Sequence, residues 1–421
     1  MELAKQARAH VARLDLSAVQ AAQLEGQAHT ARALWNLLHE FFTFRQGRFA
    51  MLKDCDAAIR QARHEIDWMG QLPAQAAQAV LKSYRQAWAN FFNPDHPAGR
   101  PTFKARFRSR LAVDVPQARD LQITRLNRRW GAVNLPKVGR VRFRWTKDLP
   151  GVTKGGPAGR ITGARLVKDA YGWTIVFRVE CEVPAPAQHS GPSVGIDRGV
   201  TVALALSDGT MREHGPWLSG GERERLRLLE KKAARQRRAR TPGEPTSRRL
   251  ARTNAQIAKA RATAKRRALD WQHQTTTELA TGFGVIVVED LKIMNMVRSA
   301  KGTVEQPGTN VAQKAGLNRA IAGEAWGRTV TLLEYKTADR GGQVVKVPAP
   351  GTSQTCHECG YRDPGNRAGT VFACKNPACG WVGHADTNGA INIANAAGTA
   401  VPGRGDLAVG RSVKRQPPRA A

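Results

Sequence analysis

The sequence predicts a multidomain α+β protein with an N-terminal helical bundle, a small β-barrel-like domain and a C-terminal α/β domain that carries a four-cysteine insertion. Three observations lead to this prediction. The spacing of apolar residues is helical over the first hundred residues and changes to alternation from about residue 120. Short strand patterns and helical stretches follow a proline-rich linker at 184–192. Four of the six cysteines fall within the 24 residues 356–379.

Residues 1–110 are expected to form the helical domain, although a first strand that joins the barrel stays open as an alternative. Ser17 and Gln20 have the spacing of a capping box. Further periodic runs cover 51–69 and 75–92. The residues that recur at helical spacing after the cap are Leu24, Ala28, Ala31, Trp35, Leu38 and Phe42.

Residues 111–188 are expected to form the barrel-like domain. In the stretch 140–145 apolar residues alternate with arginines, which places the arginines on one face of a strand. The stretch 173–183 alternates in the same way, and Cys181 falls on its apolar face. Cys181 is therefore expected to be a core thiol.

The pattern after the linker predicts an α/β domain over 192–351. Strands are expected at 193–196, 201–206 with a turn at 207–210, near 216, at 284–289 and at 343–347, and helices at 219–280, 316–338 and after Asp386. Antiparallel strands come first, and helices then alternate with parallel strands. This order is typical of a ribonuclease-H-like α/β fold.

The composition indicates a polyanionic partner. Lys and Arg number 66 against 34 Asp and Glu, which gives a formal charge of +32. No stretch is long and apolar enough to span a membrane, and the N-terminus lacks the pattern of a secretory signal. We therefore expect a cytoplasmic protein that binds nucleic acid and no membrane.

The clustered cysteines predict a structural zinc site. Cys356 and Cys359 form one pair, Cys374 and Cys379 form a second, and fourteen residues separate the pairs. A glycine follows each pair, so each is expected to form a tight turn with two thiolates on one ion. Four thiolates leave no open coordination position, and the zinc would stabilise an insertion too small for a core of its own. His357 and His384 are expected to be non-ligands.

Acidic residues lie at the ends of three separate predicted elements, an arrangement that metal-dependent phosphodiester cleavage requires. Asp197 follows the first strand, Glu289 and Asp290 end the fourth, and Asp386 begins the last helix. Adjacent strand residues point to opposite faces, so only one of Glu289 and Asp290 should join the cluster. Taken singly, each acid has an ordinary alternative as a helix cap or a solvated strand end.

Three basic segments are candidates for nucleic-acid contact, and the arginine-faced strand at 140–145 is one of them. Between Glu222 and Arg267 the chain carries 17 Lys or Arg against 4 acids, and a stretch at 242–247 would break this run into a helical hairpin. An excess of arginine favours bidentate phosphate contacts, although such a run can also be a solvated helix face. Near residue 105, phenylalanines interleave with cations, which suits stacking plus charge. The candidate contact residues are Phe103, Lys104, Arg106, Phe107, Arg235, Arg237, Arg238 and Arg240.

The ordered motifs resemble those of the TnpB/OrfB family, whose members are encoded by bacterial insertion sequences and are related to compact type V CRISPR effectors. The resemblance rests on Gly-Ile-Asp-Arg-Gly at 195–199, Val-Val-Glu-Asp-Leu at 287–291, the four-cysteine insertion and Asp-Thr-Asn-Gly-Ala-Ile-Asn-Ile at 386–393. It is specific from about 190 to 397 and weaker before that. Arg198 departs from the family pattern, which often has an apolar residue there.

The resemblance implies an RNA-guided DNA endonuclease with a RuvC-like Asp/Glu/Asp site. By matching motifs, Asp197, Glu289 and Asp386 would hold catalytic Mg²⁺, with Asp290 outside the site. The implied layout places the RuvC-like nuclease at 192–351 and 384–397, a zinc ribbon at 352–383 and a flexible basic tail at 398–421. The preceding domains, one for recognition and one wedge-like, would hold a guide RNA and double-stranded target DNA.

Several alternatives stay open at this stage. A nuclease-inactive, guide-directed DNA-binding regulator would share the fold, and so would a transposase accessory protein acting on element DNA. A general basic nucleic-acid binder with a zinc ribbon would not explain the ordered acids. Whether the protein acts as a monomer or a dimer on each RNA is undecided.

Overall fold

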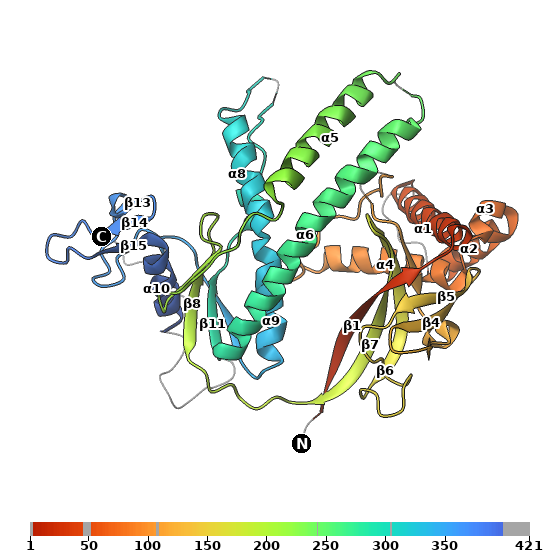
Figure 1. The fold of residues 1–421 in the computed structure, drawn as a ribbon, viewed down its shortest axis with the longest axis horizontal. Helices are drawn as coiled ribbons and strands as arrows, with labels where there is room; N and C mark the ends of the chain where they lie inside the picture. Colours follow the sequence, from red (N-terminus) through yellow and green to blue (C-terminus); the bar gives the residue numbers. More distant parts are fainter. Residues whose placement is uncertain (1–2, 45–51, 107–108, 242, 304, 399–421) are drawn as a thin grey trace. The chain divides into compact units, whose positions relative to one another are not determined.

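A computed structural model of the chain describes residues 3–44, 52–106, 109–241, 243–303 and 305–398 (Figure 1). The chain divides into two compact units, Met1–Ala185 and Pro186–Ala421. Each unit combines helices with at least one sheet, so the predicted mixed α/β composition is confirmed. Within the described ranges, no helix is both long and apolar enough to cross a membrane. Residues 399–421 of the predicted tail lie outside the described residues.

The N-terminal unit contains a seven-stranded sheet in the order β2-β6-β7-β1-β5-β4-β3, with every pair antiparallel. The strands are β1 Leu3–Asp15, β2 Ala112–Val115, β3 Thr124–Arg125, β4 Trp130–Leu135, β5 Gly139–Arg144, β6 Arg160–Asp169 and β7 Gly172–Pro184. Alternate residues of β7 are buried, as the sequence pattern predicted. Cys181 is among the buried ones, which confirms it as a core thiol.

The helices of this unit pack on the same core as the sheet. They are α1 Ala18–Phe44, α2 Leu52–Glu65, α3 Asp67–Gly70 and α4 Ala74–Phe92, with a 3₁₀ turn at Ala118–Leu121. Leu24 and Tyr84 from the helices share one buried cluster with Phe143 and Phe177 from the sheet. Residues on both sides of the expected boundary at 110 therefore contribute to a single core.

Residues 3–15 form strand β1 and not a helix. This corrects the expectation of an all-helical N-terminal domain and supports the alternative of a first strand that joins the sheet. Residues 3–15 pair with β7 over eleven positions, from Leu3 opposite Pro184 to Arg13 opposite Thr174. The segment is rich in alanine, which favours helix in isolation. Burial at alternate positions, Ala12 and Leu14, together with the long ladder outweighs that preference.

The C-terminal unit is built on a five-stranded sheet in the order β10-β9-β8-β11-β12. The strands are β8 Ser193–Asp197, β9 Leu204–Leu206, β10 Met211–Arg212, β11 Val285–Glu289 and β12 Gln343–Val347. Strands β8, β11 and β12 run parallel, whereas β9 and β10 are antiparallel to their neighbours. The turn at 207–210 joins β9 to β10, as its sequence predicted.

Helices cover both faces of this sheet. Those that pack on it are α6 Arg248–Gly282, α9 Trp326–Ala338 and α10 Ala385–Gly398. The unit also contains α5 Gly220–Arg238, which packs on α6, α7 Ile293–Met296, α8 Val311–Glu324 and a 3₁₀ turn at Pro364–Asn366. Ile286 of β11 packs with α6 and α9, whereas its neighbour Val287 packs with Ile393 of α10 on the opposite face. A Cβ at Gly195 of β8 would lie 2.2 Å from the carbonyl oxygen of Ala390, so only glycine lets α10 lie this close.

The single helix expected at 316–338 is two helices, α8 and α9. The break is at Ala325, whose φ of 49° is left-handed. Side chains on both sides of the break are anchored: His214 pairs with Glu324 at 3.0 Å, and the Trp326 indole donates to the Gly199 carbonyl at 3.2 Å. Local sequence does not reveal these distant partners, and the apolar spacing continues across the break.

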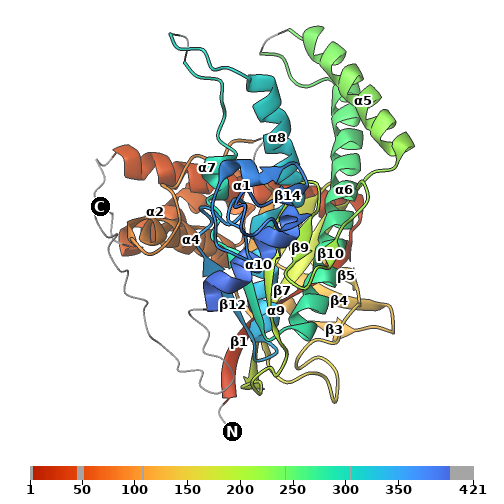
Figure 2. The same ribbon diagram turned by 90° about the vertical axis from the view of Figure 1, so that its left-hand side faces the viewer.

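Residues 352–384 form a small lobe beside α10 (Figure 2). It contains a three-stranded sheet of β13 Arg367–Ala368, β14 Val371–Ala373 and β15 Val382–His384. Phe372 is fully buried in a cluster with Cys356 and with Ala385, the first residue of α10. This cluster connects the lobe to the helix that begins at its end.

Candidate active site

The structure brings the three predicted carboxylates to one end of the five-stranded sheet. Asp197 ends β8 and Glu289 ends β11. These strands are parallel, with Val288 beside Ile196, so both carboxylates leave the sheet at the same edge. Asp386 lies in the first turn of α10. One turn later, a Cβ on Gly389 would lie 3.0 Å from Asp197 Oδ2, so α10 passes directly beside that carboxylate.

The carboxylates act on one another electrostatically. Burial raises the pKa of Asp197 from the usual 3.8 to about 7, and the negative charges of Glu289 and Asp386 add to the rise. The Arg367 guanidinium opposes it in part. A buried acid with two acidic neighbours is stabilised when a cation binds among them. The cluster therefore has the electrostatic character of a divalent-cation site.

Two of the three carboxylates are held by side chains from 352–367. Arg367 Nη2 donates to Asp386 Oδ1 at 2.7 Å, and Asp386 is 8% exposed. The Thr352 hydroxyl donates to Glu289 Oε1 at 2.6 Å. The three carboxylates do not surround one point as tightly as the thiols do: among the described residues, only the four cysteines bring three or more ligand atoms within 4.8 Å of one another.

Asp290 and Arg198 lie outside the cluster. Asp290 is exposed and pairs with Lys292 at 2.6 Å, which lowers its pKa. The Arg198 side chain is buried, and its guanidinium donates to the backbone carbonyl of Glu289. Arg198 thus ties the ends of β8 and β11 together.

Sequence reasoning missed the side chains that hold the acids, Thr352 and Arg367. Nothing in the local sequence sets Arg367 apart from the many other cations of a chain with a charge of +32. Thr352 lies beside Glu289 only because the chain returns to β11 after β12. Both contacts depend on tertiary structure.

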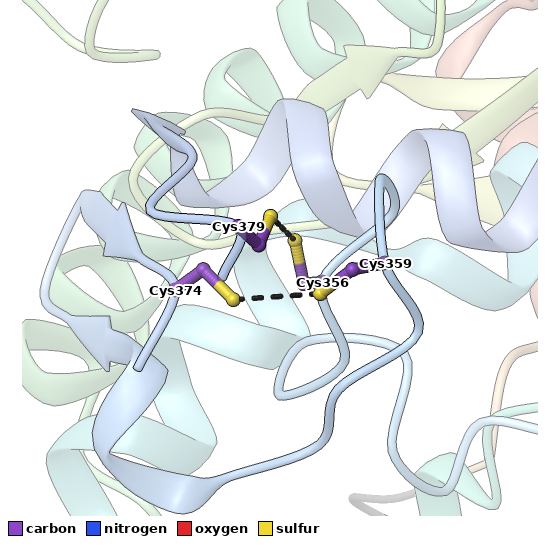
Figure 3. Close-up of side chains that lie close together, drawn as sticks. All are labelled: Cys356, Cys359, Cys374 and Cys379. Carbon is purple, nitrogen blue, oxygen red and sulfur yellow. Dashed lines mark hydrogen bonds between the residues drawn. The ribbon is translucent and has the colours of Figure 1, made fainter. Parts of the chain in front are cut away.

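The four cysteines converge on one point (Figure 3). The Sγ atoms of Cys356 and Cys379 lie 3.9 Å apart, and those of Cys359 and Cys374 lie 3.6 Å apart. These distances exceed the S–S bond of about 2.05 Å. They match the edge of about 3.8 Å expected for four thiolates at about 2.3 Å from one tetrahedral zinc. This donor set could bind zinc.

The turns around the cysteines have the expected knuckle form. Gly360 and Gly380 adopt positive φ angles of 72° and 62°, which favour glycine. The backbone N–H of Tyr361 lowers the pKa of Cys359 to about 7, which favours the thiolate. The two nearby histidines are engaged elsewhere: the His357 ring packs edge-on against Trp381, and His384 Nδ1 accepts from the backbone N–H of Asp386.

Helices α5 and α6 lie side by side as the predicted basic hairpin (Figure 1). Ser219 and Glu222 form a complete capping box at its start. Arg267 pairs with Glu222 at 2.6 Å, and Arg261 pairs with Glu230 at 2.7 Å, so these arginines fasten the two helices together. The four predicted contact arginines of the hairpin are all exposed: Arg235, Arg237, Arg238 and Arg240.

The segment around Phe103 is fixed on α1. The Trp35 indole donates to the Thr102 carbonyl at 3.1 Å, and the Asn36 side chain bonds both the N–H and the carbonyl of Lys104. Phe103 is left 62% exposed. The ammonium of Lys104 lies 3.4 Å from the centre of the Trp35 ring, and burial lowers its pKa to about 8. Phe107 lies outside the described residues, and Arg106 is exposed.

A polar groove of about 800 Å³ runs between α4 and the sheet of the N-terminal unit. On the helix side, Gln78, Lys82 and Gln86 line it at one-turn intervals. On the sheet side, Asp114 pairs with both Arg165 and Arg178. The sequence analysis did not identify this groove, because its two walls are brought together only by folding.

Comparisons with known proteins identify the family. Residues 176–300 match the family OrfB_IS605, described as "Probable transposase", and residues 326–393 match the Cas12f1-like TNB domain. The chain is 35% identical over 355 residues to InsQ of Escherichia coli (strain K12), whose name describes a proposed RNA-guided DNA endonuclease. This match covers 84% of the chain and 82% of InsQ. The chain belongs to the TnpB/OrfB family.

Two further comparisons concern a second relative and a solved structure. A protein of Streptomyces pristinaespiralis with the same description is 28% identical over 372 residues, which cover 85% of this chain and 81% of that protein. Among solved structures, Cas12f1 in its complex with sgRNA and target DNA matches with a TM-score of 0.51 at 16% identity. That match covers 90% of this chain and 83% of Cas12f1, and it shows a shared fold.

Proposed function

We propose that the chain is an RNA-guided, divalent-metal-dependent DNA endonuclease, with Asp197, Glu289 and Asp386 as its RuvC-like site. The observation that carries the proposal is the convergence of these acids from β8, β11 and α10, with the pKa of Asp197 raised to about 7. Relatives over most of the chain are named for this activity. A protein that only binds nucleic acid would have no use for a buried acid cluster.

The sheet order supports a ribonuclease-H-like core for this nuclease. Two antiparallel strands flank β8 on one side, and parallel strands β11 and β12 lie on the other. In the proposed layout, 192–351 and 384–397 form the nuclease, 352–383 forms a zinc ribbon, and the N-terminal unit comprises the recognition and wedge-like parts, 1–110 and 111–188.

The donor chemistry of the acid cluster fits Mg²⁺, which prefers carboxylate oxygens. Asp197, Glu289 and Asp386 would hold the ions, which would supply an activated water molecule and charge stabilisation for the leaving oxygen of the scissile phosphodiester. The chain's own residues hold this site in shape: Arg198 ties the ends of β8 and β11, and Thr352 and Arg367 orient two of the carboxylates. The four thiols fit a structural zinc, because all four positions of a tetrahedral ion would be filled.

Guide RNA and target DNA are proposed to lie on the basic surfaces of the two units. The exposed arginines of the α5–α6 hairpin suit backbone phosphates. Phe103, held out from α1 beside cations, suits stacking against a base. The polar groove along α4 offers amide side chains that can hydrogen-bond to base edges. In such an assembly, base pairing supplies the sequence specificity and the protein holds the backbone.

The proposal is tested by purifying the protein from its host and sequencing the nucleic acid that it retains. A discrete RNA species is expected. Asp197→Ala should then abolish cleavage of a matching DNA while RNA retention is unchanged, because Asp197 lies in the acid cluster and not on the basic surfaces. Asp290→Ala is the matched control, since this neighbouring acid is exposed and paired with Lys292. A preparation without discrete RNA, or cleavage that survives Asp197→Ala, would contradict the proposal.

The alternative of a nuclease-inactive regulator is less consistent with the site, because all three acids are present and converge. The alternative of a transposase accessory protein predicts binding to element DNA without a guide. Binding and cleavage assays on the same purified protein distinguish these functions. RNA-dependent cleavage supports the endonuclease, and RNA-dependent binding without cleavage supports the regulator.

A further inference from the structure

Two asparagines, one of them fully buried, join the first cysteine knuckle to α10, the helix that carries Asp386. Asn388 is fully buried; its amide donates to the carbonyl of Thr355 at 2.8 Å, and its side-chain oxygen accepts from the N–H of His357 at 3.0 Å. These two contacts bracket Cys356, a thiol of the proposed zinc site, which is itself fully buried. One turn along α10, the Asn392 amide donates to the carbonyls of Thr352 and Thr355 at 2.9 and 2.6 Å.

The same knuckle also holds the second carboxylate. Thr352, whose backbone carbonyl accepts from Asn392, donates its hydroxyl to Glu289 Oε1 at 2.6 Å. The stretch 352–357 thus contacts Glu289 at one end, presents Cys356 near the other and is fastened to α10 along its length. A displacement of this stretch would therefore change the position of Glu289 relative to Asp386.

The hydrogen bonds of Asn388 and Asn392 are separate from the contacts that attach α10 to the sheet. Ile393 and Ala397, four residues apart, already pack one face of α10 against the sheet. Asn388 and Asn392, also four residues apart, lie on a different face of α10 and hydrogen-bond to the knuckle. A buried amide left without its partners is costly, so the helix and the knuckle are expected to move together.

We infer that Asn388 and Asn392 are positioning residues that couple the cysteine metal site to the acid cluster, so that occupancy of each site strengthens binding at the other. The inference rests on the proposed function, because it takes Glu289 and Asp386 to be metal ligands. Coupling between two sites is reciprocal: if zinc in the thiols improves Mg²⁺ binding at the carboxylates, Mg²⁺ must tighten zinc by the same factor. The effect can therefore be measured at the zinc site, without measuring cleavage.

The experiment measures the zinc affinity of the full-length protein by equilibrium competition with a zinc-binding dye, with and without saturating Mg²⁺. In the parent protein Mg²⁺ is expected to tighten zinc binding and so protect the zinc from the dye. Loss of the two hydrogen bonds that Asn388 makes to the knuckle should reduce that protection about tenfold or more in Asn388→Ala, to the point where Mg²⁺ has little effect. Asn392→Ala and the closer mimic Asn388→Asp provide the same test if the first variant folds poorly.

Asn366→Ala is the matched control. This asparagine is equally buried and makes three hydrogen bonds, to Gln354, Tyr361 and Lys375, all within the lobe. Its variant should bind zinc more weakly, and Mg²⁺ should still tighten that binding by the parent's factor. Under single-turnover conditions, Asn388→Ala should slow the cleavage step and leave the target concentration for half-saturation unchanged.

The outcomes separate the inference from the proposed function. If Mg²⁺ does not tighten zinc binding in the parent protein, or if Asn388→Ala keeps the full protection, the coupling is refuted. If Asn366→Ala also loses the protection, its assignment to the two asparagines is refuted. Replacement of Asp386 with asparagine tests the proposed function instead: if it changes neither Mg²⁺ protection nor cleavage, the carboxylate site itself is wrong.

Discussion

Replacing Asp197 with asparagine is expected to stabilise the protein in the absence of divalent cations, although it should abolish cleavage. In the folded protein this carboxylate is buried beside Glu289 and Asp386, which raises its pKa to about 7. An amide has nearly the same shape and carries no charge, so it removes the repulsion and keeps the packing. If Asp197 had been selected only for stability, its replacement with asparagine would not be expected to stabilise the protein.

The size of the effect follows from the pKa. A rise from the usual 3.8 to about 7 corresponds to at most about 4 kcal/mol, at about 1.4 kcal/mol for each pH unit. The amide also loses whatever hydrogen bonds the carboxylate makes, such as the backbone contact at Arg198. We therefore expect a net gain of about 1–2 kcal/mol at pH 8, or roughly 2–8 °C in the midpoint of the C-terminal unit.

The pH dependence has a definite sign. Asp197 is protonated in the folded state up to about pH 7, whereas in the unfolded chain it ionises near pH 4. Between these values the folded state binds the extra proton, so the stability contributed by this residue falls as pH rises, and it is constant above pH 7. The advantage of Asp197→Asn should therefore be small at pH 4 and reach its full size at about pH 7–8.

The assay is denaturant unfolding of parent and variant in magnesium-free buffer across pH 5–8.5, with zinc retained. The difference between the two proteins isolates this residue from the many other titrating groups. Asp290→Asn is the control with the opposite sign, because pairing with Lys292 lowers the pKa of that acid. Added Mg²⁺ should stabilise the parent and not Asp197→Asn. A variant no more stable than the parent at pH 8, or an advantage independent of pH, would refute the reasoning.

Three further predictions concern other parts of the molecule. Cys359→Ser removes one of four converging thiols and should reduce the zinc content of the purified protein below one per chain, as measured by metal analysis. The double substitution Arg235→Gln/Arg238→Gln should weaken the salt dependence of RNA binding, measured as a decrease of about 1–2 in the magnitude of the slope of log affinity against log salt concentration. Arg227→Gln should have a smaller effect, because the Arg227 guanidinium already pairs with Glu224. Gly195→Ala places a Cβ 2.2 Å from the Ala390 carbonyl and should cost about 1–3 kcal/mol in urea unfolding, because α10 must shift.

The sequence predicted those parts of the fold that local patterns encode. The strand expected at 343–347 is observed as β12 at the same residues. Its sequence is a short apolar run between turn signals, a local pattern that predicts a buried strand. Residues 3–15 fell within the expected helical domain, with a first strand left open, and only pairing with β7 decides for a strand. The acids could be ordered along the chain from their motifs. The residues that orient them, Thr352 and Arg367, could not be found, because contacts between distant segments leave no local signal.

The distribution of charge around the acids supports a cation site more specifically than the overall charge does. A chain with a charge of +32 could neutralise three carboxylates many times over. Among the described residues, Arg367 binds Asp386, and the Arg198 guanidinium donates to the backbone carbonyl of Glu289. Burial raises the pKa of Asp197 to about 7, the charges of Glu289 and Asp386 add to the rise, and Arg367 opposes it only in part. Three carboxylates, one of them deeply buried, thus share one paired guanidinium, and a divalent ion would favour the ionised form of Asp197 at the proposed site.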